Sequence, residues 1–323
     1  MKKIISLILA ILMLTLVFTG CDILNFGDRG GESESESENN ESNSVEEESE
    51  SKLEESPATD FEYKVLSDGT IEVSYIGNNA YVVVPEKIEN KDVTVIAADG
   101  FEKAKPFLKA VILPKTIKTV ELRAFKDCIL LESVNIPSSV SKIGAIAFKN
   151  CVALERIEIY SNCLDVNSEA AFQASGIKTV ILGEGVSYIP TWCFAETPLS
   201  EIVIPSTVTE IGYSAFAGCA LERITLNEGL TTIGHKAFVS NIQLQEITIP
   251  KTVTSVTEMA FSGCSSLEKV IFKGNAPATY EYSDSITGKW DPINTNYTVY
   301  YHQGAQGFTS PEWYGYTTEI LGK

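Results

Sequence analysis

A repeat of 22 to 24 residues runs through most of this 323-residue chain and limits what the chain can fold into. One clear copy spans residues 199–219 and reads LSEIVIPSTVTEIGYSAFAGC. Every copy has a phenylalanine at the same position, which we call the frame phenylalanine: Phe101, Phe125, Phe148, Phe172, Phe194, Phe216, Phe238 and Phe261. A fixed period of this length predicts a solenoid, in which each repeat forms one coil that stacks on the next.

The pattern inside each copy predicts how one coil is built. It runs L-x-x-I-x-I-P and then V-x-x-I-G-x-x-A-F. The alternation in I-x-I is typical of a short strand with one face buried, and stacked copies then form a parallel sheet. We expect V-x-x-I to form a second short strand or extended turn, and the segment from glycine to phenylalanine to begin a short helical turn. One coil buries too little to be stable alone, so the coils must fold cooperatively.

This pattern resembles the bacterial surface leucine-rich repeats of the BspA-like family. Four coils carry its proline-containing motif: Leu108-Val111-Leu113-Pro114, Leu131-Val134-Ile136-Pro137, Leu199-Ile202-Ile204-Pro205 and Leu244-Ile247-Ile249-Pro250. Three coils have Tyr160, Gly183 or Asn227 in place of the proline. The resemblance covers about residues 61–323 and implies a leucine-rich repeat solenoid, mainly β, with parallel β coils and short helical turns. It also implies a surface protein that binds partners and is not an enzyme.

The N-terminus has the features of an export signal. Two lysines follow Met1, and residues 4–18 form an apolar stretch of 15 residues, which is too short to span a membrane comfortably. Residues 18–21, Phe-Thr-Gly-Cys, resemble a bacterial lipobox. The resemblance implies a signal peptide over residues 1–20, lipid attachment at Cys21, and a cell-surface protein anchored to the outer face of the membrane. A secreted protein without an anchor is the alternative.

Residues 21–60 are expected to be the lipidated N-terminus followed by a disordered spacer rich in Ser and Glu. Residues 28–60 contain 11 Glu and 2 Asp against Arg29 and Lys52, a net charge of −11, with almost no apolar side chains. Like charges extend such a chain, so we expect it to hold the folded part away from the membrane. A cation-binding or partner-binding acidic tail is the alternative. Residues 61–323 carry the remaining charge of −8, which argues against nucleic acid as a partner.

The folded part divides into three predicted units. Residues 61–100 form an N-terminal cap and first partial repeat, and Asp68 with Gly69 predicts the turn of a hairpin at its start. Residues 101–272 form the leucine-rich repeat solenoid. Residues 273–323 form an aromatic-rich C-terminal cap. Caps are expected because the ends of a solenoid expose apolar surface and unpaired strand edges.

The C-terminal unit also allows a second interpretation. Its aromatic residues are Tyr280, Tyr282, Trp290, Tyr297, Tyr300, Tyr301, Phe308, Trp313, Tyr314 and Tyr316. Flat aromatic faces stack on sugar rings, so this end is the alternative candidate for a glycan-binding surface, provided that Trp290 and Trp313 are exposed. The oxygen-bearing side chains of Asp284, Asp291 and Asn294 lie in the same unit, but their spacing matches no calcium motif.

Most cysteines fit a structural column better than a disulfide framework. Three residues after each frame phenylalanine stands a small side chain able to hydrogen-bond: Cys128, Cys151, Ser175, Thr197, Cys219, Asn241 and Cys264. This column resembles the Asn/Cys ladder of leucine-rich repeats. A Cys128–Cys151 disulfide is the alternative, but side chains of stacked coils point the same way, which favours buried free thiols. Cys163 and Cys193 fall at apolar positions of the pattern, so we assign them to the core.

The exposed face of the strands is the candidate surface for a protein partner. Two outward columns supply the candidate partner-binding residues: Arg156, Glu158, Thr179, Ile181, Glu201, Val203, Arg223, Thr225, Glu246 and Thr248. Charges alternate along the second half of one column, as expected for pairs between successive coils. The neighbouring column mixes apolar and polar residues. Pairing and β-propensity alone also account for such residues.

No motif predicts catalysis. The sequence has no P-loop, no G-x-S-x-G, no H-E-x-x-H and only two histidines, and no cysteine pair has the spacing of a zinc site. We therefore predict no enzyme, no cofactor and no metal. The leading hypothesis is a lipid-anchored surface protein that binds an extracellular protein through the exposed solenoid face, as an adhesin does. A glycan-binding module and a passive envelope spacer are the alternatives.

Overall fold

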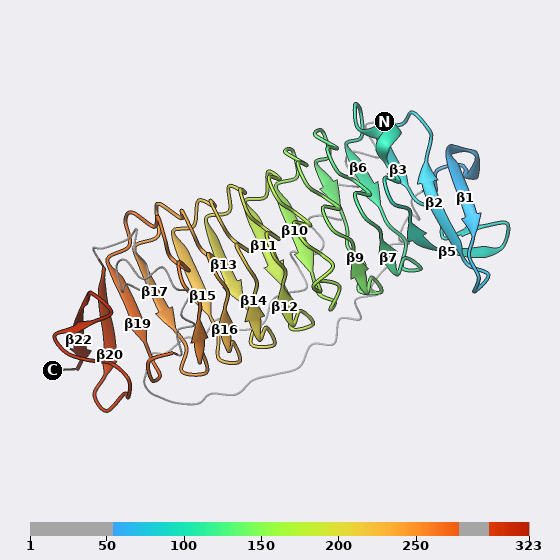
Figure 1. The fold of residues 1–323 in the computed structure, drawn as a ribbon. Helices are drawn as coiled ribbons and strands as arrows, with labels where there is room; N and C mark the ends of the chain where they lie inside the picture. Colours follow the sequence, from blue (N-terminus) through green and yellow to red (C-terminus); the bar gives the residue numbers. More distant parts are fainter. Residues whose placement is uncertain (1–53, 278–296, 323) are drawn as a thin grey trace, which may run out of the picture. The chain divides into compact units, whose positions relative to one another are not determined.

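A computed structural model describes residues 54–277 and 297–322 of the chain. The chain divides into two compact units, Met1–Ser51 and Lys52–Lys323, and all of the described residues belong to the second. Within that unit the repeats form a β-solenoid, as the sequence predicted (Figure 1). The predicted signal peptide, the lipid-attachment residue Cys21, the first part of the spacer and Trp290 lie outside the described residues.

The I-x-I segment of each repeat forms the first strand of its coil, and these strands lie side by side in Figure 1. We call the surface they present the strand face. Its strands are β3 (Tyr81–Val83), β6 (Ala110–Ile112), β8 (Ser133–Val134), β10 (Arg156–Ile159), β11 (Thr179–Leu182), β13 (Glu201–Ile204), β15 (Arg223–Leu226), β17 (Glu246–Ile249) and β19 (Lys269–Phe272). Every paired neighbour within it is parallel, with equivalent residues of successive coils opposite each other. The predicted parallel sheet is therefore confirmed.

The V-x-x-I segment forms a second, shorter strand in most coils, as expected. These strands make up the second face: β5 (Lys91–Ile96), β7 (Thr119–Val120), β9 (Lys142–Ile143), β12 (Tyr188–Ile189), β14 (Glu210–Ile211), β16 (Thr232–Ile233) and β18 (Ser255–Val256). They pair in parallel in two groups, β5-β7-β9 and β12-β14-β16-β18. The apolar side chains between the two faces form one continuous core.

Other strands flank the coils at both ends. Near the start, β1 (Phe61–Val65) and β2 (Ile71–Tyr75) form the predicted antiparallel hairpin, and β4 (Lys87–Ile88) pairs with β5. Residues 54–60, which we had assigned to the spacer, contact the first coil, because the Ser56 amide donates to the Val83 carbonyl. At the other end, β20 (Thr298–His302) and β22 (Tyr316–Leu321) extend the strand-face sheet in parallel, and β21 (Glu312–Trp313) pairs with β22.

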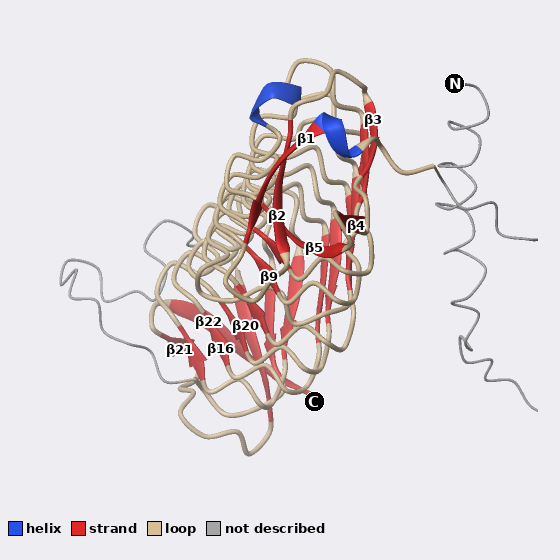
Figure 2. Ribbon diagram, turned by 90° about the vertical axis from the view of Figure 1, so that its right-hand side faces the viewer, coloured by secondary structure: helices blue, strands red, loops and turns tan. Residues whose placement is uncertain are grey.

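The segment from glycine to phenylalanine contains turns more than helix. Among the described residues, helix is limited to the short 3-10 segments η1 (Ala58–Asp60) and η2 (Glu102–Ala104) (Figure 2). The residue two before each frame phenylalanine has a positive φ: Asp99, Arg123, Ile146, Ala170, Trp192, Ser214, Lys236 and Met259. A left-handed residue at this point interrupts a right-handed helix. The frame amide instead donates to the next coil, as Phe194 does to the Ala215 carbonyl at 2.9 Å.

The frame phenylalanines form one stack of rings along the core. From Tyr75 through Phe101 to Phe261, successive ring centroids lie 4.4 to 5.8 Å apart and adjacent ring planes differ by 2° to 26°. All eight frame side chains are buried. Aromatic pairs at this separation add a packing contribution beyond the area that they bury. The stack therefore holds every coil in register with its neighbours.

The column three residues after the frame phenylalanine is a hydrogen-bond ladder, as predicted. Cys151, Cys219 and Cys264 each donate a thiol hydrogen to a frame carbonyl of the preceding coil, with sulfur–oxygen distances of 3.1 to 3.2 Å. The Asn241 side-chain amide donates to the carbonyls of Phe216 and Phe238, both at 2.8 Å. The six cysteines of the described residues, including Cys163 and Cys193, are all buried and free. The interpretation as buried free thiols is therefore confirmed for these residues.

Removal of one ring from the stack tests its contribution to stability. We expect Phe216→Ala to lower the free energy of unfolding by about 3 to 5 kcal/mol, because it leaves a cavity and two unpartnered ring faces. Urea unfolding followed by circular dichroism measures this change. Tyr160→Ala, at an exposed position, is the control and should change stability by less than about 1 kcal/mol. Equal effects of the two variants would contradict the role of the stack.

The ladder thiols predict a loss of stability at high pH. Burial raises the pKa of Cys219 from 9.0 to about 11. Above pH 9 the thiol ionises in the unfolded chain but stays protonated in the folded one, so the unfolded state binds fewer protons and stability falls with rising pH. Below pH 9 this contribution is fully present. We expect the wild-type protein to lose about 2 to 3 kcal/mol more than Cys219→Thr between pH 8 and pH 11. Parallel stability curves for the two proteins would contradict this account.

Candidate functional site on the strand face

The ten predicted partner-binding residues lie on five strands of the strand face. Each strand contributes two, which are separated by one inward-facing residue: Arg156 and Glu158 on β10, Thr179 and Ile181 on β11, Glu201 and Val203 on β13, Arg223 and Thr225 on β15, Glu246 and Thr248 on β17. All ten are exposed or partly exposed. The registers place equivalent residues opposite each other within each bonded pair of strands. The fold therefore arranges them in the two outward columns that the repeat predicted.

Charged residues of the first column pair between coils. Glu201 Oε2 lies 2.8 Å from Arg223 Nη2, and Glu246 Oε2 lies 3.6 Å from Lys269 Nζ. The hydrogen bond with Glu201 raises the pKa of the Arg223 guanidinium further above its ordinary value, so Arg223 stays charged. Both pairs are well exposed, and such pairs contribute only about 0.2 to 1 kcal/mol to stability. Arg156 instead pairs within its own strand, with Glu158.

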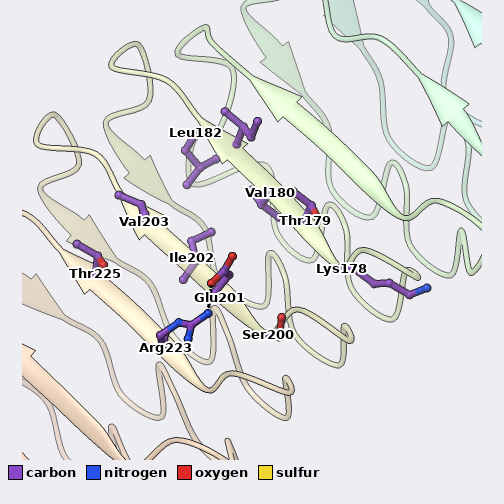
Figure 3. A pocket seen from close by; sticks show the side chains of 11 residues that line it. Lys178, Thr179, Val180, Leu182, Ser200, Glu201, Ile202, Val203, Arg223 and Thr225 are labelled. Atoms are coloured by element: carbon purple, nitrogen blue, oxygen red, sulfur yellow. Dashed lines mark hydrogen bonds and ion pairs between the residues drawn. The ribbon is translucent and has the colours of Figure 1, made fainter. Parts of the chain in front are cut away.

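A hollow of about 600 Å³ opens on the strand face between β11 and β13 (Figure 3). We call it the groove. Six of the ten predicted residues line it: Thr179, Ile181, Glu201, Val203, Arg223 and Thr225. Arg156, Glu158, Glu246 and Thr248 do not. Figure 3 shows the lining side chains on the neighbouring strands β11, β13 and β15, with Arg223 directed toward Glu201.

The groove lies where the strand ladder is interrupted. Among the described residues, no backbone hydrogen bond joins β11 to β13, and the ladder is also interrupted between β8 and β10 and between β15 and β17. The inward-facing Val180 and Ile202 consequently line the floor of the groove. Residue periodicity did not predict this opening, because it places residues on a face without fixing the separation of the strands. Lys178, Leu182 and Ser200 also line the groove, and sequence reasoning missed them.

One of the missing backbone bonds has a covalent cause. The residue after β11 is Gly183, whose amide donates to the Ile159 carbonyl of the preceding coil at 2.8 Å. The corresponding residue after β13 is Pro205, which has no amide hydrogen and leaves the Leu182 carbonyl without this donor. Pro250 stands in the same position after β17. Between β6 and β8, where Pro137 follows, the side chain of Asn135 bonds both backbone groups of Leu113 and bridges the strands instead.

A second hollow, of about 590 Å³, lies beside the groove at the next interruption of this ladder. Its lining is entirely polar: Glu222, Arg223, Gln243, Gln245 and Ser266. Arg223 therefore lines both hollows and separates them. The groove on one side has apolar and hydroxyl side chains, and the second hollow has amide and charged side chains. The sequence columns included Arg223, but the repeat did not predict that it lines two hollows.

One of the two tryptophans that the glycan alternative requires to be exposed is buried. Trp313 is only 4% exposed. Its ring packs against Phe272, Phe308 and Tyr314, with centroids 6.0, 5.0 and 5.0 Å away. Trp290, Asp284, Asp291 and Asn294 lie outside the described residues. The alternative therefore loses one of the two tryptophans on which it depended.

Two features are absent from the described residues. These residues contain no group of three or more His, Cys, Asp and Glu side chains arranged to hold a metal ion. Over the same ranges no helix has the length and apolar character needed to cross a membrane.

Comparison with known proteins identifies the family. A model described as the BspA type leucine rich repeat region matches in six copies, over residues 94–220 and 189–285. The chain belongs to the BspA-type leucine-rich repeat family. No curated protein matches this BspA-type chain at a significant level.

Solved structures of bacterial leucine-rich repeat proteins also resemble it. The leucine-rich repeat protein TpLRR of T. pallidum is 24% identical with a TM-score of 0.52, over 66% of this chain and 91% of that one. A leucine-rich cell surface protein of Faecalibacterium prausnitzii is 19% identical with a TM-score of 0.38, over 79% and 96% of the two chains. The pneumococcal vaccine antigen PcpA is 16% identical with a TM-score of 0.38, over 82% and 98%. The likeness to TpLRR supports the leucine-rich repeat fold.

Proposed function

We propose that this BspA-type chain is a bacterial surface protein that binds an extracellular protein through its strand face, centred on the groove between β11 and β13. The observation that carries the proposal is the groove itself, because six exposed or partly exposed side chains from three successive coils line one opening on the strand face. Coils of a leucine-rich repeat act as binding modules in this family. The proposed role is non-catalytic.

The chemistry of the groove suits a protein partner. Val203, with 58% of its surface exposed, supplies an apolar contact that the fold itself does not use. Thr179 and Thr225 supply hydroxyl groups, and the Glu201–Arg223 pair supplies both charges. Protein interfaces combine an apolar centre with a polar rim, and arginine is prominent among their energetically important residues. The exposed ion pair contributes little to the stability of the fold. Arg223 can therefore leave Glu201 and pair with a group of the partner protein at little cost in stability.

The N-terminal segment supplies the proposed attachment to the cell. In this proposal the signal directs export, lipid on Cys21 anchors the protein to the outer face of the membrane, and the acidic spacer, shortened to residues 28–53, holds the solenoid away from it. A surface-anchored module whose strand face binds a protein outside the cell acts as an adhesin. The BspA-type relatives of this chain are bacterial cell-surface proteins, which supports this location.

A binding experiment tests the groove. The mature chain with Cys21→Ser is titrated onto a panel of immobilised extracellular-matrix proteins. We expect saturable binding to at least one of them, weakened by about tenfold or more in Val203→Asp/Arg223→Glu, because this double variant removes the apolar contact and reverses the shared charge.

The matched control for the groove is Val166→Asp/Lys269→Glu. It makes the same changes at an exposed valine and at the basic member of the other interstrand ion pair, outside both hollows. Binding should survive in this control. Equal loss of binding in both variants would show that the binding site lies elsewhere on the solenoid. The absence of binding to every protein of the panel would favour a passive envelope spacer.

A labelling experiment tests the anchor. In a bacterial host fed an alkyne fatty acid, we expect the wild-type chain to carry the label and to sediment with membranes, because a lipidated Cys21 holds it there. Cys21→Ser should lose the label and appear in the medium. Cys264→Ser, which changes a buried ladder cysteine, should remain labelled. A labelled Cys21→Ser protein would exclude this lipid site.

A further inference from the structure

Three half-exposed aromatic rings follow one another on the turns that come after the second-face strands. Trp192, Tyr213 and His235 belong to the same three coils as the groove, but each follows the second strand of its coil. The ring centroids of Trp192 and Tyr213 lie 5.8 Å apart, and those of Tyr213 and His235 lie 5.5 Å apart. We call these residues, together with Tyr188 on β12, the aromatic corner.

The fold does not require aromatic residues at these positions. Tyr213 and His235 stand three residues before their frame phenylalanines, where other coils have Leu122, Ala145, Glu169, Thr191 and Glu258. The same turn therefore accepts small, apolar, hydroxyl and charged side chains. The buried stack of frame phenylalanines continues through these coils without help from the outer rings. Tyr213 is 39% exposed, so its ring is available to a ligand.

The rings differ in how they face the solvent. Tyr213 and His235 lie nearly parallel, with an angle of 16° between them, and cover each other's faces. Trp192 is inclined at 60° to Tyr213. In the preceding coil the small Ala170 occupies the position of Trp192, so Trp192 ends the row of rings with no aromatic neighbour beyond it among the described residues. The flat face of a ligand ring can therefore lie against Trp192 in the angle that it makes with Tyr213.

Polar groups lie beside the rings. The Tyr188 hydroxyl lies over Gly212 of the next coil, where an added Cβ would come within 3.0 Å of it. Glu210 stands directly opposite Tyr188 in the β12–β14 register. A carboxylate and a hydroxyl beside aromatic rings offer both acceptors and a donor to a ligand that has its own hydroxyl groups.

The charges near the aromatic corner disfavour an acidic ligand. The charge of Glu210 faces Tyr188. The charges of Lys236 and Glu258 both affect the pKa of His235, and burial together with Lys236 lowers that pKa below 6.5. At neutral pH His235 is therefore uncharged, and two carboxylates stand against one ammonium group. A sulfated or uronic-acid chain would be repelled. An uncharged sugar combines apolar C–H faces, which pack on aromatic rings, with hydroxyl groups, which pair with Glu210 and Tyr188.

We propose that the aromatic corner is a second binding site, specific for an uncharged pyranose chain. This site is separate from the groove and does not depend on the protein-binding role. It also differs from the C-terminal aromatic unit, whose Trp313 is buried.

Affinity electrophoresis of the mature chain with Cys21→Ser tests the site. Gels contain dextran, laminarin, soluble starch or xylan as uncharged probes, and dextran sulfate as the acidic one. We expect at least one uncharged polysaccharide to retard the protein, with affinity reduced about tenfold or more by Trp192→Ala and by Tyr213→Ala. Tyr213→Phe should retain binding, because it keeps the ring. Dextran sulfate should not retard the protein.

Tyr63→Ala is the matched control, because Tyr63 is as exposed as Tyr213 but lies on the N-terminal hairpin. It should bind like the wild-type protein, and circular dichroism verifies that each variant is folded. The proposal is overturned if no uncharged polysaccharide retards the wild-type protein, if Trp192→Ala/Tyr213→Ala binds unchanged, or if Tyr63→Ala loses binding equally. Retention of matrix-protein binding in the aromatic variants, with loss of sugar binding, would separate this site from the groove.

Discussion

The contact between equivalent residues of successive coils is the interaction on which the whole structure depends. Each frame phenylalanine packs on the next, and its amide donates to the carbonyl before the next ring, so ring stacking and hydrogen bonding fix the same register. Neither interaction exists in one isolated coil. The fold therefore behaves as a one-dimensional array, in which each coil contributes one ring, one left-handed turn and one small polar group to a continuous column.

This register leaves the outward positions free to vary. Inward positions are restricted to side chains that fill the core or bond the backbone of the next coil, as Cys219 and Asn241 do. Outward positions only need to tolerate a strand or a turn. The strand face can therefore carry the Glu201–Arg223 pair and the exposed Val203, and the turns can carry Trp192 and Tyr213, without effect on the stack. Binding residues can thus change from coil to coil while the scaffold stays constant.

The two candidate sites arise where individual coils depart from the regular pattern of the repeat. The groove opens where the ladder between β11 and β13 is interrupted, and Pro205 removes one of the backbone donors there. The aromatic corner arises where three neighbouring coils carry rings that their turns do not need. Both sites use the same three coils. The groove lies on the strand face, whereas the aromatic corner lies on the turns after the second-face strands. A single short section of the solenoid therefore offers two surfaces of different chemistry.

The repeat, the cysteine column and the two outward columns follow from the sequence alone, because a strict period places equivalent residues at equivalent positions in every coil. From that period Cys193 was assigned to the core and Arg223 to the surface, and the N-terminal hairpin followed from its Asp-Gly turn. The stack of phenylalanine rings and the separation of β11 from β13 emerge only in three dimensions, since ring contacts and strand spacing depend on how whole coils pack. The burial of Trp313 emerges there too, because it depends on packing against Phe272, which is distant in sequence.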